Sequence, residues 1–212
     1  MPSISLRDPL RLSHSFRFPL QSALARREVL IGALWLLVPV IGWLLNMGHR
    51  IAMVRRMQDG QEAWPSWQGY PQLLRDGTLT FLGMVLYTSP GIALVCAGWF
   101  WSLPWLIAVG ALLFAAAVFA IPGYMTHYCW TGDPREIFNP FRALVRVRQG
   151  GRAYLRAWGI ALAALGLSFV GLAGLGVGFL VTSVWFWQVA GFSFAVVFSQ
   201  AALDLPRKRH SF

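Results

Sequence analysis

The chain has 212 residues, of which 57% are hydrophobic, 15% aromatic and only 12% charged. About a quarter of the residues in an ordinary soluble domain are charged, so this composition excludes that class and indicates a polytopic α-helical membrane protein. Eighteen Lys and Arg against eight Asp and Glu leave a net charge of +10. Because the basic residues cluster beside uncharged blocks, we expect them to attract anionic lipid headgroups, and we expect no nucleic-acid partner.

Three blocks contain no Asp, Glu, Lys or Arg: residues 29–49, 77–132 and 157–203. At roughly 20 residues per crossing, the second and third blocks are each long enough for two membrane spans joined by a turn. We predict spans over 78–99 and 103–124, and two more within 157–203 with a turn between 176 and 183. The predicted organisation is a basic cytoplasmic arm (1–28), a single helical membrane domain (29–205) and a basic cytoplasmic tail (206–212).

Residues 29–45 are apolar but short for a span, and Gly32, Pro39 and Gly42 interrupt them. Proline breaks helical hydrogen bonding, which a bilayer tolerates only where protein covers the freed carbonyl. If this segment crossed the membrane, the basic arm and the next basic loop would face opposite sides, against the positive-inside rule. We therefore favour a re-entrant helical hairpin that turns near Pro39, with a fifth span as the alternative.

The polar connection at 46–77 begins as an amphipathic interfacial helix. Its apolar residues recur at helical spacing, at Met47, Ile51, Val54 and Met57. Its arginines lie at other positions: Arg50, Arg55 and Arg56. Asp59-Gly60 is a helix stop, an aromatic turn follows, and Asp76 is placed to cap the next helix. Trp and Tyr favour the membrane interface. The residues expected to meet lipid or a partner here are Arg50, Arg55, Arg56, Trp64 and Trp67.

A second amphipathic interfacial helix is predicted to begin at Asn139-Pro140, since Asn is a common cap and Pro suits the first helical position. Gly150-Gly151 would end it. Phe141, Leu144 and Val145 face away from Arg142 and Arg146, and we expect Arg142, Arg146 and Arg148 to meet lipid or a partner. In the last block, Gly174 and Gly178 form a GxxxG pair that predicts close helix packing.

No catalytic constellation is present in the sequence, and no Walker or dinucleotide-binding glycine motif. His49 and His127, at the edges of apolar blocks, could each ligate a metal or a chlorophyll-type magnesium, but a histidine bonded to lipid or backbone is the favoured interpretation. Cys96 and Cys129 are isolated, which indicates buried free thiols. We therefore predict no enzyme, no cofactor and no metal site.

Residues 46–77 resemble the bacterial and archaeal membrane family known as domain of unknown function 4013. The family pattern begins with a Gly and an aromatic residue, followed by a basic helix and a second Gly; in this chain these are Gly48-His49, residues 50–57 and Gly60. A Leu-Pro-x-Trp turn and an Asp-Gly complete the pattern, and here they read Trp64-Pro65-Ser66-Trp67 and Asp76-Gly77. His49 replaces the usual aromatic residue and Trp64 the usual Leu. The resemblance extends over residues 17–203, with Ile121-Pro122-Gly123-Tyr124 and Asn139-Pro140-Phe141 as later matches. It implies a compact helical membrane domain and supplies no activity.

The leading functional hypothesis is an accessory or scaffold subunit that packs against a larger membrane assembly or organises lipid. Its expected partners are anionic lipids at the basic face and other membrane protein subunits. The expected location is a prokaryotic inner or internal membrane, with both termini cytoplasmic. The alternative is a small-solute transporter or channel with a path at the break near Pro39, although ion-coupled carriers usually keep a charged residue at membrane depth and the uncharged blocks hold no Asp, Glu, Lys or Arg.

Overall fold

The computed structural model describes residues 5–174 and 176–203, and residues 200–203 by their backbone only. Within these ranges all regular structure is helical. Four helices are long and apolar enough to cross a membrane: Tyr70–Phe100, Pro104–Thr131, Pro140–Ala173 and Val177–Ser199. The protein is therefore an all-α, multi-pass membrane protein, as the uncharged blocks predict. The predicted basic tail at 206–212 lies outside the described residues.

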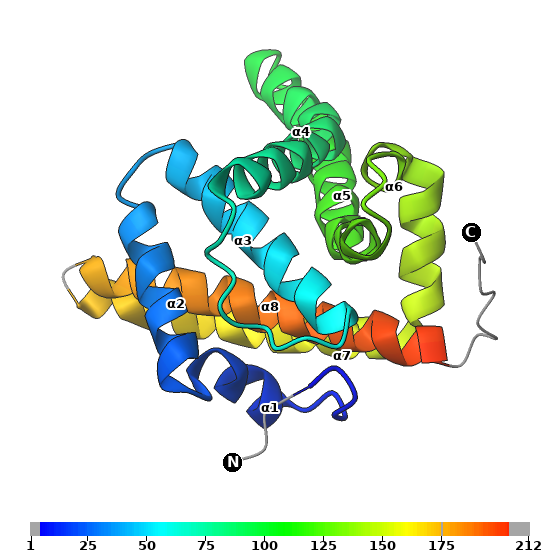
Figure 1. Cartoon of the computed structure of the whole chain (residues 1–212). Coiled ribbons are helices and arrows are strands. Elements are labelled where there is room, and N and C mark those ends of the chain that lie inside the picture. Colours follow the sequence, from blue (N-terminus) through cyan, green and yellow to red (C-terminus); the bar gives the residue numbers. More distant parts are fainter. Residues whose placement is uncertain (1–4, 175, 204–212) are drawn as a thin grey trace.

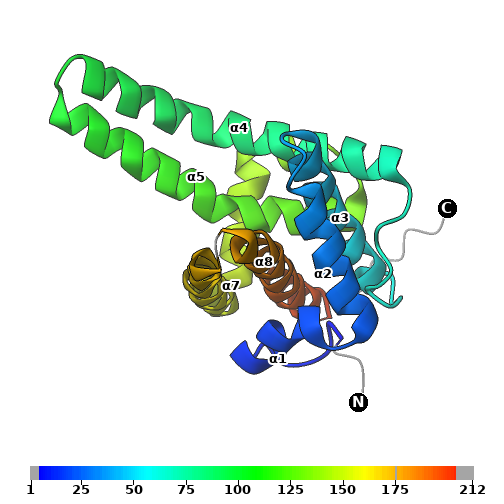
Figure 2. The same cartoon turned by 90° about the vertical axis from the view of Figure 1, so that its left-hand side faces the viewer.

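The long helices form two hairpins that point in different directions from a common base (Figures 1 and 2). One consists of α4 (Tyr70–Phe100) and α5 (Pro104–Thr131) with a turn at 101–103. The other consists of α7 (Pro140–Ser168), the 3-10 helix η2 (Phe169–Ala173) and α8 (Val177–Leu203). The predicted turn at 176–183 is thus placed too late, because α8 has already begun at Val177 and the connection falls in the preceding glycine-rich stretch.

The start of α4 also differs from the prediction. The helix begins at Tyr70 and not at 78, with Pro71 in its first turn, where the missing backbone N–H leaves no intrahelical bond unmade. Asp76 therefore lies inside α4 as a buried residue and is not the cap of this helix.

The N-terminal segment packs against α8. Helices α1 (Leu12–Arg17) and η1 (Phe18–Leu20) precede α2, and the ring of Phe18 stacks on Phe192 with centroids 4.4 Å apart. Trp185 Nε1 donates a hydrogen bond to the Phe16 carbonyl oxygen at 3.2 Å. From residue 5 onward, the stretch that we predicted as a basic arm is thus part of the folded body.

Helices α2 (Ala23–Trp35) and α3 (Ile41–Gln58) form a short hairpin with its turn at 36–40. Ile41 N donates to the Pro39 carbonyl oxygen at 2.7 Å, and Val40 has φ 64° and ψ −64°, which is a γ-turn with positive φ. Asn46 Nδ2 donates to the Gly32 carbonyl oxygen at 3.1 Å and so joins the two helices. The end of α3 at Gln58 confirms Asp59-Gly60 as a helix stop.

Helix α3 meets α4 through two glycines. A Cβ on Gly48 would lie 1.8 Å from the Leu73 carbonyl oxygen, and a Cβ on Gly77 would lie 1.8 Å from the Leu44 carbonyl oxygen. Only residues without a side chain permit this approach of the two backbones. The contact attaches the α4/α5 hairpin to the base of the molecule.

The first part of α7 has the predicted start and end. Asn139 Oδ1 accepts hydrogen bonds from the backbone N–H groups of Phe141 and Arg142 at 3.0 and 3.2 Å, and Pro140 is the first helical residue. Gly151 has φ 48° and ψ −135°, so it interrupts the helix. The yellow-green section of α7 before Gly151 stands steeply to the rest of the helix (Figure 1). This section follows the short helix α6 (Arg135–Phe138).

Candidate functional site

The structure has three polar clusters of interest. The first, the Glu28 cluster, joins the α2/α3 hairpin to the loop before α4. His49 Nε2 lies 2.9 Å from Glu28 Oε2, which also accepts a hydrogen bond from Ser66 N at 2.9 Å. The Trp67 indole N–H donates to the Glu28 carbonyl oxygen at 3.0 Å, and its ring stacks on His49 with centroids 4.2 Å apart. His49 is only 1% exposed, so the cluster is interior.

Burial and hydrogen bonding set the charge state of this cluster. Burial lowers the pKa of His49 below its usual value, so its imidazole is neutral near pH 7 and Nε2–H donates to the carboxylate. For Glu28, burial raises the pKa, but the hydrogen bonds from His49 and Ser66 outweigh it and the net pKa is lowered. The pair is thus an ionised carboxylate with a neutral imidazole.

The second cluster is centred on Asp76 and connects three helices. Tyr128 Oη on α5 donates to Asp76 Oδ1 at 2.6 Å, and Arg55 Nη1 on α3 donates to Oδ2 at 3.1 Å. Gln72 Nε2 adds hydrogen bonds of 3.1 Å to both carboxylate oxygens. Asp76 is 1% exposed, and a buried carboxylate with this many donors is fully paired. The Asp76 cluster is therefore structural.

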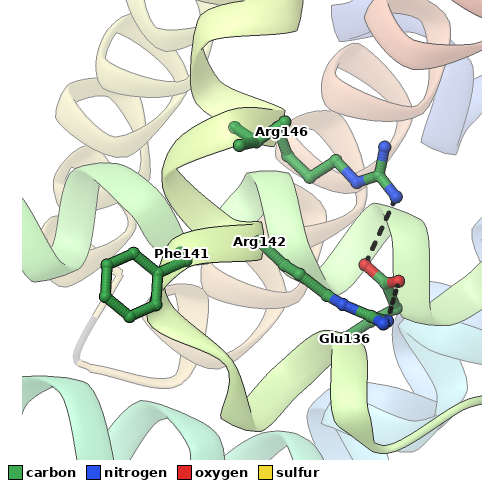
Figure 3. Close-up of a pocket in the computed structure, with 5 residues that line it drawn as sticks. Glu136, Phe141, Arg142 and Arg146 are labelled. Carbon is green, nitrogen blue, oxygen red and sulfur yellow. Dashed lines mark hydrogen bonds and ion pairs between the residues drawn. The ribbon is translucent and has the colours of Figure 1, made fainter.

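The third cluster surrounds an open cavity of about 440 Å³, which we call the basic hollow (Figure 3). It is lined by Glu136, Phe141, Arg142, Val145 and Arg146. Arg142 Nη1 lies 2.7 Å from Glu136 Oε1, and Arg146 Nη2 lies 3.5 Å from Oε2. The Phe141 ring points away from this ion pair. Two guanidinium groups share one carboxylate, so the hollow keeps a positive charge.

Arg146 also borders a second hollow of about 220 Å³, together with Gln58, His127 and Trp130. The Nε of Arg146 and the Oε1 of Gln58 are buried without a hydrogen-bond partner in the described structure. Buried polar atoms usually have partners, so these two leave hydrogen-bonding capacity for a ligand or water.

The first section of α7 turns an apolar face outward beside the basic hollow. Phe141 is 78% exposed, and Leu144 and Val145 are exposed as well, whereas Ala143 on the opposite face is buried. Arg148 is exposed on the same section. Chemically, this surface suits an amphiphile with an anionic head.

Of the residues that we expected at a lipid or partner surface, Trp64 and Trp67 are buried within the protein, which corrects that expectation for both, and three arginines are half-buried with protein partners. Trp64 is 5% and Trp67 8% exposed, because the loop at 59–69 folds back and its indoles cover His49. Arg55 is held by Asp76, and Arg50 lies over the Trp187 ring. Arg56 Nε donates to the Glu62 carbonyl oxygen at 2.9 Å. Arg142, Arg146 and Arg148 are the expected surface residues that the structure brings together.

The two candidate histidines have protein partners. His49 faces Glu28, and His127 Nδ1 lies 3.1 Å from the Gly123 carbonyl oxygen. Across the described ranges, no group of three or more His, Cys, Asp and Glu could hold a metal ion.

In the glycine-rich turn between α7 and α8, the closest backbone approach is not at the predicted pair, Gly174 and Gly178. A Cβ on Gly178 would lie 2.6 Å from the Gly171 carbonyl oxygen. A Cβ on Gly174, by contrast, would lie 3.6 Å from Gly178 Cα, an ordinary contact. The tight approach therefore joins Gly171 to Gly178.

Sequence reasoning missed the acidic residues of two clusters, Glu28 and Glu136. The available signal was scarcity, since the chain has only eight acids and acids beside membrane segments need partners. Glu28 directly precedes the first uncharged block, and Glu136 precedes the arginines of α7. Their partners follow from the folding of the chain and not from sequence spacing.

Comparison with known proteins gives one finding. The family model described as Protein of unknown function (DUF4013) matches residues 31–182. No curated protein and no solved structure matches the chain. The matched range contains His49, the Asp76 cluster and the basic hollow, and it begins just after Glu28.

Proposed function

The chain belongs to the DUF4013 family, and we propose that it is a membrane accessory protein that binds anionic lipid headgroups at the basic hollow. In this role it organises lipid beside a larger membrane assembly. The observation that carries the proposal is the pairing of the basic hollow with the outward apolar face of Phe141, Leu144 and Val145. An outward apolar strip next to two arginines that share one carboxylate is the arrangement of an interfacial helix.

Positive charge and exposed apolar area together favour lipid binding at the basic hollow. Each Arg near an anionic membrane surface contributes about 1 kcal/mol of attraction, and an exposed aromatic ring such as Phe141 adds buried apolar area. Arg142 is 44% exposed at its side chain while Glu136 is 6% exposed, so the cationic partner of the pair faces outward. An incoming phosphate meets the guanidinium groups before it meets the carboxylate.

The proposed placement puts the basic side of the protein in the cytoplasm of a prokaryotic cell, with the protein in the inner or an internal membrane. The α2/α3 hairpin re-enters the membrane from this side. Its turn and the adjoining helix ends support that placement because large apolar side chains are exposed there: Leu34, Leu37, Val38, Val40, Ile41 and Trp43. The apolar residues of α3 at Ile51 and Val54 are buried within the protein, so we propose an interfacial role for the first section of α7 alone.

The transporter alternative gains no specific support. Pro39 lies in the exposed turn of the α2/α3 hairpin, and neither hollow described above is lined by residues of that turn. Electrogenic flux in liposomes that contain the purified protein would overturn the accessory role. A stoichiometric membrane protein partner, retained in mild detergent without flux, is the expected result.

Native mass spectrometry of the detergent-extracted protein tests lipid binding at the basic hollow. The test variant combines Arg142→Gln, Arg146→Gln and Glu136→Gln, so no buried carboxylate is left unpaired. We expect it to retain phosphatidylglycerol at least about threefold less than the wild type, the effect of removing one ionic contact. Arg27→Gln, which makes the same change in net charge at an exposed position of α2, should retain it as the wild type does. Equal retention by the two variants would contradict the proposal.

A further inference from the structure

Arg50 is a partly buried cation without an acidic partner. Arg55 pairs with Asp76, and Arg142 and Arg146 pair with Glu136, but in the described part of the chain no carboxylate lies within ion-pair distance of Arg50. Burial lowers the pKa of Arg50, although a guanidinium keeps its proton in proteins. A charge withdrawn from water without a counter-charge is costly, so this position favours an anion.

Helices α5 and α8 form the surroundings of the Arg50 guanidinium. Its carbon Cζ lies 4.9 Å from the centroid of the Trp187 ring on α8, and its Nη2 lies 3.3 Å from Met125 Sδ on α5. Gly191 on α8 leaves room for the aliphatic stem, since a Cβ there would lie 3.0 Å from Arg50 Cγ. The cation–π contact and the sulfur contact orient the group but neutralise no charge.

A second polar group on the same turn of α8 also lacks a partner. Gln188 follows Trp187 directly and is 1% exposed. Both its Nε2 and its Oε1 are buried without a hydrogen bond in the described structure. A buried amide with neither atom bonded is rare. The turn of α8 that contacts Arg50 therefore has hydrogen-bonding capacity to spare.

The Trp187 side chain is 41% exposed, so the surroundings of Arg50 reach the protein surface at this ring. Over residues 181–199 Trp187 is the only exposed side chain. Arg50 contacts both α5 and α8, and these helices belong to two hairpins that point in different directions (Figures 1 and 2). Trp43 and Met47 precede Arg50 on the same face of α3 by helical spacing, and Trp43 is exposed. The path away from the guanidinium is thus apolar.

We propose that Arg50 binds the phosphate of one membrane phospholipid held in the angle between the α4/α5 and α7/α8 hairpins. The lipid phosphate meets the guanidinium, Gln188 supplies a further polar contact, and an acyl chain lies along Trp187 and Trp43. A phospholipid fits better than a soluble anion because the approach is apolar. Arg50 lies eight residues before the end of α3 at Gln58, which is roughly 12 Å below the polar end of that helix. This site is separate from the basic hollow.

The experiment compares wild-type protein with Arg50→Met after exhaustive delipidation in detergent. Thermal stability is measured while phosphatidylglycerol is added in mixed micelles, and native mass spectrometry counts the bound lipids. We expect one tightly held phospholipid per wild-type chain and a rise in melting temperature with added lipid. Arg50→Met should fold, because an apolar side chain replaces an unpaired charge, and should bind at least about tenfold more weakly. Arg50→Lys, which keeps the charge, should recover part of the binding.

Three outcomes would overturn this proposal. Equal lipid binding by wild type and Arg50→Met would assign Arg50 a purely structural role. Stabilisation by inorganic phosphate or oleate equal to that by phosphatidylglycerol would remove the phospholipid from the assignment. Loss of a co-purifying protein, and not of a lipid, in Arg50→Met would replace the lipid with a protein partner. The triple variant of the basic hollow should keep this lipid, so failure of one proposal is distinguishable from failure of the other.

Discussion

Helices α4 and α8 are equally apolar, but the protein buries them to very different extents. Their most apolar stretches have mean hydropathy 1.7 and 1.6, yet 17% of the α4 stretch and 61% of the α8 stretch is buried within the protein. Hydropathy therefore reports that both helices suit a membrane and says nothing about which one faces lipid.

The difference arises from the elements that pack on each helix. Helix α8 contacts the N-terminal segment, α2, α3 and α7, whereas α4 contacts mainly α3 near its start and α5 along its length. Figure 2 shows the outer part of the α4/α5 hairpin extending away from the other helices. The protein thus has two regions. One is a packed base, made of α8 and the elements that contact it. The other is the projecting α4/α5 hairpin, which we call the α4/α5 arm and whose outer surface is left to lipid.

The largest expected effect comes from breaking the attachment of the arm to the base. Gly48→Leu forces a side chain into the Leu73 backbone, where even a Cβ would lie at 1.8 Å. Because backbone cannot move aside as a side chain does, we expect loss of most monodisperse protein in size-exclusion chromatography. Gly159→Leu in α7, where a Cβ meets nothing within 4 Å, is the control and should behave as wild type.

A matched pair of truncations measures the difference between base and arm directly. Phe192 on α8 is 1% exposed and Leu112 on α5 is 72% exposed. Phe192→Ala should cost about 3 kcal/mol of unfolding free energy, since it leaves a cavity beside Phe18. Leu112→Ala should change it by less than about 0.5 kcal/mol. Reversible unfolding by denaturant measures both values. Equal losses of unfolding free energy in the two variants would show that Leu112 is packed in the folded state, against our expectation.

Lowering the pH should destabilise the region around His49 and Glu28 before it affects the outer part of the α4/α5 hairpin. The pKa of His49 is lowered in the fold from its usual 6.5, so the unfolded chain binds a proton first as pH falls, and stability declines below about pH 6.5. The lowered pKa of Glu28, usually 4.5, adds its own loss only in stronger acid.

Hydrogen exchange at pH 7 and pH 5.5, corrected for intrinsic rates, measures this response. We expect faster exchange at pH 5.5 in α3 and the loop at 59–69, with no change in the outer parts of α4 and α5. His49→Gln should abolish the difference. Uniform acceleration over the whole chain would contradict a local origin.

The smallest expected effect is a stabilisation. Val40 has φ 64°, a conformation that costs a β-branched residue about 1–3 kcal/mol. Val40→Gly removes this strain and loses only an exposed side chain, so the unfolding free energy should rise by about 1 kcal/mol. A Val40→Ala variant, which keeps a Cβ at the same φ, should gain less. Destabilisation by Val40→Gly in a thermal scan would contradict the assignment of strain.

Local signals in the sequence were sufficient to predict the helical class and several helix ends. The stop at Asp59-Gly60 and the cap at Asn139-Pro140 depend on neighbouring residues alone, and the structure has both. Asp76 was assigned to a cap because it precedes an apolar run, although Pro71 in a first helical turn was the better signal.

Long-range pairings could not be predicted in the same way. The burial of Trp67 depends on its hydrogen bond to Glu28, across 39 positions of sequence, and no pattern of spacing encodes that contact. Likewise, the directions of the two hairpins depend on which helix packs at the base. The charge-free blocks of the sequence do not encode these directions.

The turns at the outer ends of the two hairpins also bear on how the protein is made. Residues 101–103 and 169–176 contain no charged side chain, and neither does any position of the surrounding blocks at 77–132 and 157–203. Moving an Arg or Asp through the centre of a bilayer costs about 2.5–3.5 kcal/mol on insertion scales. Each hairpin can therefore enter the bilayer as a pair of helices during biosynthesis without any Asp, Glu, Lys or Arg crossing it.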